Sequence, residues 1–127
     1  MKTVAELVEE IKAHELPLLD LYRELETAAS GRTEKLLAGQ MLSYQKFQVK
    51  SLDLFSGQMP DKFHSFGAIV EDDVNVRSGA APSYPVITKV NKGTPVIITE
   101  FVGNWAHVQL PDGQRGFVFR AYAKSES

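Results

Sequence analysis

The chain contains no cysteine and only three histidines among its 127 residues. Without cysteine it can form no disulfide, no thiolate zinc site and no cysteine nucleophile, although this absence is neutral about redox compartment. His14, His64 and His107 lie far apart, without the paired spacing of a zinc motif. The sequence therefore predicts no metal site and no cofactor.

Long apolar runs are missing as well. No run approaches the roughly 18 apolar residues that a membrane-spanning helix needs. The first ten residues carry acids where a secretory signal needs an apolar core. We therefore expect a cytoplasmic protein without a membrane span, while noting that a mature exported form with its leader removed would look the same.

An excess of basic charge is missing too. The net charge is −2, and acidic residues equal or outnumber basic ones both before and after Phe66. Nucleic-acid binding draws much of its affinity from Lys and Arg contacts to phosphates, so this class of function is set aside. The hydrophobic share of 43% and charged share of 24% are ordinary for a soluble globular chain of one ordinary or two small domains.

Catalytic motifs are not found. Glu9 and Glu10 are adjacent and would point about 100° apart on a helix, so they cannot share a proton. Asp72 and Asp73 suit a turn and supply too few oxygens for calcium. No serine stands in a nucleophile elbow, and no glycine-rich loop precedes a helix. We predict that the protein is not an enzyme.

The second half of the chain is rich in short β-type runs. Each run contains β-branched or aromatic residues, and turn residues separate most of them, including Asp112-Gly113, a strong hairpin signal. About sixty residues with strands this short indicate a small barrel. The expected strands are residues 67–70, 74–77, 86–90, 95–102, 105–110 and 115–119.

Alternation along residues 105–110 assigns faces to the side chains. Ala106, Val108 and Leu110 share one face, which is uniformly apolar and predicted to be core. Trp105 is left on the more polar face, where we expect an exposed indole that can touch a ligand. An aromatic group could meet on one side of the barrel as a platform for an extended peptide, or could instead complete a small core. Its members are Tyr84, Trp105, Phe117, Phe119 and Tyr122.

Five pieces of this half resemble the bacterial SH3 domain, over residues 67–123. They are Val74-Asn-Val-Arg-Ser-Gly79, Lys92-Gly-Thr94, Asn104-Trp-Ala-His-Val108, Gly113-Gln-Arg-Gly-Phe-Val118 and a final Tyr122. The order and spacing carry the resemblance, since no single piece is specific. The chain departs from the family pattern in having Val74 for Leu, an Ala-Ala-Pro insertion after Gly79, Asn104 for Gly and Phe117 for Trp.

The resemblance implies an SH3-like barrel and a binding function. Asn75 and Arg77 are the family's signature pair, which could contact a ligand or could hold a turn and a strand edge in place. Relatives of this domain often target peptidoglycan as accessories to hydrolases. The resemblance therefore implies a cell-wall alternative to the recognition of an extended peptide.

The first half has a helical period. Apolar residues recur at three- and four-residue spacing from Val4 to Ala29, after a capping box formed by Thr3 and Glu6. We expect Pro17 to kink or break this helix near Ala13–Leu16. Thr33 is predicted to cap a second helix that runs to Phe55, and the short connection predicts an antiparallel hairpin.

The two helices carry more apolar surface than they can enclose between them. The excess must meet the barrel, a second copy of the chain or a partner. We therefore predict an α+β protein with a helical hairpin over residues 1–57, a docked linker over 58–66 anchored by Phe63 and Phe66, and an SH3-like barrel over 67–127. We expect a non-enzymatic binding protein whose hairpin self-associates as a homodimer or docks a partner. A purely structural barrel that caps an oligomer is a third hypothesis.

Overall fold

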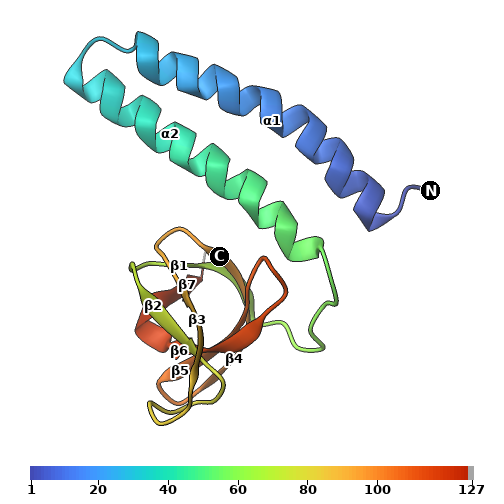
Figure 1. Ribbon diagram of the computed structural model, residues 1–127. Helices are drawn as coiled ribbons and strands as arrows, with labels where there is room; N and C mark the ends of the chain where they lie inside the picture. The colour runs from blue at the N-terminus through green and yellow to red at the C-terminus, as the bar shows by residue number, and fades with distance from the viewer. Residues whose placement is uncertain (126–127) are drawn as a thin grey trace. The chain divides into compact units, whose positions relative to one another are not determined.

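The computed structural model describes residues 1–125 (Figure 1). The chain divides into two compact units, Met1–Leu52 and a second unit that begins at Asp53. Two helices form the first unit, and a seven-stranded antiparallel sheet forms the second. The predicted α+β class is confirmed. The units are described separately below as the helix pair and the sheet unit.

Helix α1 spans Val4–Ala28 and begins where the capping box predicts. The Thr3 hydroxyl accepts a hydrogen bond from the Glu6 backbone N–H at 3.1 Å, and the Glu6 carboxylate accepts one from the Thr3 N–H at 3.1 Å. The predicted break at Pro17 is wrong, because the helix continues through this residue. Ala13 and Pro17 both face solvent, so the Ala13 carbonyl that lacks an N–H partner can remain hydrated.

Helix α2 spans Arg32–Ser51, and its chain continues as the 3₁₀ helix η1, Leu52–Phe55. Thr33 does not cap this helix as predicted. Gly31 occupies the N-cap without a side-chain hydrogen bond. The Glu34 carboxylate instead accepts a hydrogen bond from the Ser30 N–H at 3.3 Å, so a side chain in the first turn stabilises the start of the helix.

Figure 1 shows α1 and α2 side by side and running in opposite directions. Leu19 of α1 and Ala38 and Leu42 of α2 are buried. A hydrogen bond from the Gln45 amide to the Glu15 carboxylate also joins the two helices. Few residues are buried at this contact, and most of the larger apolar side chains of both helices remain exposed.

The strands follow one another in the sheet order β3-β2-β6-β5-β4-β1-β7, with every neighbouring pair antiparallel. Four expected strands have the predicted bounds, whereas β1 begins earlier than expected and β7 was not predicted. The elements are β1 Ser65–Ile69, β2 Val74–Arg77, β3 Val86–Val90, β4 Pro95–Val102, β5 Trp105–Gln109, β6 Arg115–Phe119, the 3₁₀ helix η2 Arg120–Tyr122 and β7 Ala123–Ser125.

The hairpin at Asp112-Gly113 joins β5 to β6 as predicted, although its turn is not the type I′ turn that Asp-Gly favours in two-residue hairpins. Only Gly113 of this pair has a positive φ, at 89°, whereas a type I′ turn needs two such residues. The Leu110 carbonyl accepts a hydrogen bond from the Gly113 N–H at 2.9 Å, and the Asp112 carboxylate accepts one from the Gln114 N–H at 2.9 Å. A side-chain hydrogen bond therefore stabilises this longer loop.

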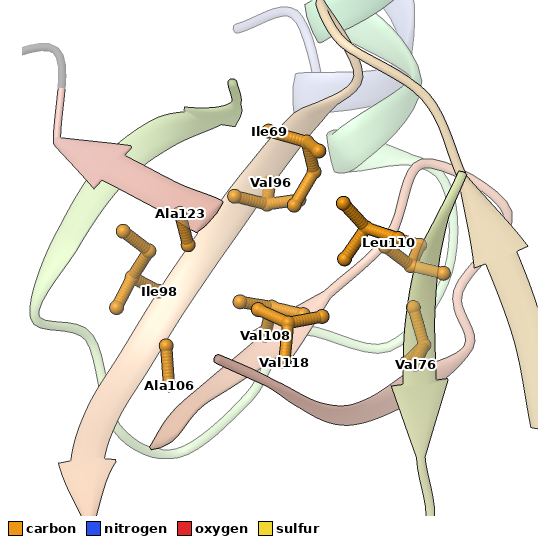
Figure 2. Packing of buried hydrophobic residues seen from close by; sticks show 10 residues of the cluster. Ile69, Val76, Val96, Ile98, Ala106, Val108, Leu110, Val118 and Ala123 are labelled. Atoms are coloured by element: carbon orange, nitrogen blue, oxygen red, sulfur yellow. The ribbon is translucent and has the colours of Figure 1, made fainter. Parts of the chain in front are cut away.

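The sheet curls around an apolar core whose members come from most of its strands (Figure 2). Ala106, Val108 and Leu110 all belong to this core, which confirms the face predicted from alternation. A Cβ atom on Gly116 would lie 2.8 Å from the Arg77 carbonyl oxygen, so only glycine allows β2 and β6 to approach this closely. The remaining core residues are Ile69, Val74, Val76, Val96, Ile98, Val118 and Ala123.

The segment before β1 is bonded to the sheet through polar groups. The Gln58 carbonyl accepts hydrogen bonds from the Gln109 amide and the Arg115 guanidinium, each at 3.2 Å. Lys62 pairs with Glu100 at 2.7 Å. Phe63 is 68% exposed, so its predicted role as an apolar anchor is wrong. Backbone hydrogen bonds, the Lys62–Glu100 ion pair and an edge-to-face contact between the His64 and Phe101 rings hold this segment.

Candidate functional site

Four rings form two cross-strand pairs on the outer face of β5 and β6. Trp105 lies opposite Phe119 and His107 lies opposite Phe117 in the strand register. The ring centroids are 4.5 Å apart in the first pair and 4.6 Å in the second, and both pairs are stacked. Because the intervening residues point into the core, alternation directs all four rings outward.

Trp105 is only 8% exposed, so the prediction of an exposed indole is wrong. The Phe119 ring stacks on the indole and excludes solvent from that face. The Asn104 carbonyl accepts a hydrogen bond from the Arg120 N–H at 2.7 Å, which joins the two strand ends beside the indole. Trp105 therefore packs under the Phe119 ring and is not itself accessible to a ligand on this face.

Phe119 and Tyr122 form an accessible pair of neighbouring rings within the aromatic group, which we call the aromatic edge. Their side chains are 44% and 37% exposed and meet edge to face, with centroids 5.9 Å apart. The turn of η2 brings Tyr122 beside the end of β6. The Tyr122 carbonyl accepts a hydrogen bond from the Val70 N–H at 3.0 Å, which fixes this turn against the chain after β1.

Two shallow hollows adjoin the aromatic edge, one at each ring. The first, of about 400 Å³, is lined by Asn104, Phe119, Arg120 and Ala121. The Arg120 guanidinium carbon lies 4.0 Å from the centre of the Phe101 ring, and this cation–π contact fixes its position. The lining of the first hollow therefore includes one basic residue, Arg120, and one amide residue, Asn104.

The second hollow, of about 290 Å³, has the opposite charge. It is lined by Glu71, Asp72, Asp73, Val74 and Tyr122. The Asp72 carboxylate accepts a hydrogen bond from the Lys92 N–H at 3.1 Å, and Asp73 lies 3.4 Å from the Lys89 ammonium. Among the described residues, Asp73 is the only one of these three acids with an ion-pair partner, so the hollow is lined by more acidic charge than the neighbouring lysine offsets. Sequence reasoning assigned the two aspartates to a turn and overlooked that the turn adjoins Tyr122.

Asn75, Arg77 and Tyr84 lie at the β2–β3 end of the sheet. The Arg77 guanidinium donates to the Tyr84 carbonyl at 3.0 Å and so holds the loop between the two strands. The Tyr84 ring is 49% exposed and packs on Gly79, where a Cβ atom would lie 2.6 Å from the ring. The buried Asn75 Oδ1 accepts no hydrogen bond within the described part of the chain. Arg77 pairs with Phe117 across the strands, which connects this region to the outer rings.

His107 is held in one orientation by Thr99. The Thr99 hydroxyl donates to the His107 carbonyl at 3.1 Å and lies 2.7 Å from Nδ1. Because the hydroxyl has a single proton to donate, both contacts are satisfied together only when Nδ1 is protonated and donates to this oxygen. Burial lowers the pKa of His107, and the nearby Glu100 carboxylate opposes that shift only in part. The ring is therefore a neutral stacking partner for Phe117 at neutral pH.

The site is suited to binding through rings, hydrogen bonds and opposite charges. Over residues 1–125, no three His, Asp or Glu side chains converge in a way that could hold a metal ion. Within the same residues, neither helix has the length and apolar character needed to cross a bilayer.

Residues 72–124 match the family model of the bacterial SH3 domain. This confirms the resemblance for a segment of the chain that runs from the turn before β2 into β7. The helix pair lies outside the match.

A protein of Bacillus subtilis (strain 168) named "Putative N-acetylmuramoyl-L-alanine amidase YrvJ" is 40% identical over 50 residues. The alignment covers 39% of this chain and 10% of the Bacillus protein. The similarity is therefore confined to about a tenth of that relative.

Proposed function

We propose that this protein is a non-enzymatic binding module that recognises an extended cell-wall peptide at the aromatic edge. The observation that carries the proposal is the exposed Phe119–Tyr122 pair, placed between two hollows of opposite charge. Tyr and Phe bury a large area while losing little conformational freedom, which suits them to contact a flexible chain. The stacked Trp105 keeps Phe119 in position before a ligand arrives.

The charges indicate which peptide groups each hollow prefers. The carboxylates beside Tyr122 suit an ammonium group, and Arg120 with Asn104 suits a carboxylate or a carbonyl oxygen. A peptide that carries a free amine and a free carboxylate, separated by a few residues, complements both hollows. Peptide stems of peptidoglycan have this chemistry.

The relative supports a wall peptide as the source of the ligand. Its name is that of an amidase for a muramoyl–alanine bond, and the similarity falls within the sheet unit. The amidase activity is not part of the proposal, because the aligned stretch is a tenth of that protein.

Sedimentation with purified peptidoglycan tests the proposal. We expect the full chain to enter the pellet, and we expect Phe119→Ala and Tyr122→Ala each to weaken binding about tenfold, or ~1.4 kcal/mol. Phe63→Ala is the matched control, because Phe63 is an exposed ring in the same unit, 68% accessible, and lines neither hollow. A soluble stem peptide should compete, and acetylation of its amine should weaken that competition.

The alternative ligand is an extended peptide of another protein. That reading fits the cytoplasmic location predicted from the N-terminal residues, whereas a wall ligand requires the protein to reach the wall. A protein that remains in the supernatant with purified peptidoglycan would overturn the wall proposal. If Phe119→Ala also left capture of arrayed peptides unchanged, the aromatic edge itself would be wrong as the site.

A further inference from the structure

Helix α1 carries an exposed apolar stripe that its contact with α2 does not use. The stripe follows alternating three- and four-residue steps, which is the a/d spacing of a coiled-coil interface. Its apolar members are between 39% and 58% exposed, and the one polar member is the exposed His14. The members are Val4, Leu7, Ile11, His14, Leu18, Leu21 and Leu25.

Helix α2 adds a second stripe on the same side of the helix pair. Leu37, Met41 and Tyr44 are 59%, 42% and 69% exposed. In each helix the stripe residues immediately precede residues that are buried between the two helices: Leu18 precedes Leu19, and Met41 precedes Leu42. Consecutive residues are rotated by about 100° about the helix axis, and the rotation has the same sense in both helices when each is followed from its N-terminus. Because the helices run in opposite directions, these rotations bring both stripes to one side, which we call the apolar face.

The apolar face is large enough for a stable interface. At roughly 100 Å² for each of these partly exposed side chains, nine apolar residues offer about 900 Å², close to the ~800 Å² that each partner contributes to a standard interface. The largest apolar patch of a typical monomer is about 300–600 Å². The size of the face therefore suits a partner that covers both helices together.

The charges of the two helices favour a second copy in one arrangement. Helix α1 has seven acidic and two basic residues, whereas α2 has one acidic and four basic residues. Glu10 and Glu24 border the α1 stripe, so placing α1 over α1 of a partner would oppose acid to acid. Placing α1 over α2 of the partner opposes helices of opposite net charge at about 8–10 Å, within roughly one Debye length.

We propose that the apolar face is the interface of a homodimer, in which α1 of each copy packs over α2 of the other as a four-helix bundle. Each helix then has antiparallel neighbours, as in up-down bundles. The same surface serves both copies, which a two-fold symmetric interface requires. The inference goes beyond peptide recognition, because it assigns a partner to the unit that lies outside the matched domain.

Light scattering of the full chain over a hundredfold range of concentration tests this proposal. We expect twice the chain mass of 14.1 kDa at high concentration. Leu21→Glu should shift the mass to the monomer. Leu16→Glu is the matched control, because Leu16 is 51% exposed against 58% for Leu21 but lies on a different side of α1. Circular dichroism should show the same helix content in both variants.

A second variant covers the case in which Leu21→Glu unfolds the helix pair. His14→Leu completes the apolar stripe and should tighten the dimer at least severalfold. A monomeric wild-type chain at every concentration overturns the proposal, since the face is then covered by another part of the chain or by another protein. A mass that responds equally to Leu16→Glu and Leu21→Glu also overturns it. Failure of wall binding is a separate result, because Phe119→Ala should leave the dimer mass unchanged.

Discussion

At the scale of single residues, burial and stacking set the roles of the aromatic side chains. Alternation in β5 correctly separated the core residues from Trp105, but it could not show what covers the outer face. Phe119 covers that face through a cross-strand pair, and such a pair depends on register between two strands. The sequence therefore predicted the ring cluster more successfully than it predicted which rings are exposed.

His107 makes the stability of the sheet unit dependent on pH. Burial lowers its folded-state pKa below the usual 6.5, so the unfolded chain binds the proton more readily than the folded chain. The stability from the neutral ring is present above about pH 6.5 and decreases as the pH falls through the lower folded-state pKa. We expect the urea concentration at the unfolding midpoint to decrease as the pH is lowered from 7.5 to 5.

His107→Asn isolates this contribution. The Asn amide can still donate to the Thr99 hydroxyl, while the titrating ring is removed. The variant should be less stable at pH 7.5 because it loses the stack on Phe117, yet its midpoint should change less between pH 7.5 and 5. A slope as steep as that of the unaltered chain would show that another group causes the pH dependence.

At the scale of elements, the strands were easier to predict than the helix boundaries. Short β-branched runs with turn residues at both ends fixed β2, β3, β4 and β6, because the turns leave little choice of register. The three residues of β7 have no period of their own and become a strand only by pairing with β1. The start of α2 was less predictable, because Gly31 occupies the N-cap and the Glu34 side chain, rather than that of Thr33, accepts a backbone hydrogen bond there.

Replacing Pro17 with alanine should stabilise the helix pair measurably. A proline inside a helix is about 3 kcal/mol less favourable than alanine, because the ring clashes with the preceding turn and a backbone hydrogen bond is lost. Pro17→Ala restores an N–H donor for the Ala13 carbonyl in a helix that already continues through this site. We expect about 1–3 kcal/mol of added stability in urea unfolding followed at 222 nm.

Leu16→Ala provides the comparison for this prediction. Leu16 is a half-exposed neighbour whose truncation leaves the helix hydrogen bonds intact, so its effect should stay within about 0.5 kcal/mol. If Pro17→Ala had no larger effect than Leu16→Ala, the proline would not be a source of strain in α1.

At the scale of the whole molecule, a dimer formed through the helix pairs would carry two ligand sites, one on the sheet unit of each copy. The protein would then be bivalent. Two linked sites bind a polymer with repeated ligands more tightly than one site does, because the second contact forms at a raised effective concentration. We expect Leu21→Glu to weaken retention on intact peptidoglycan by tenfold or more. The same variant should bind a soluble stem peptide with unchanged affinity in calorimetry. Equal losses for polymer and peptide would show that the substitution damages the site itself.

The single tryptophan of the chain lies directly beneath the ring that is proposed to meet the ligand. Its emission depends on the packing and polarity around the indole, so an occupant that presses on Phe119 should alter the fluorescence of the unlabelled protein. The chain thereby contains its own optical reporter, positioned one ring away from the contact it would report.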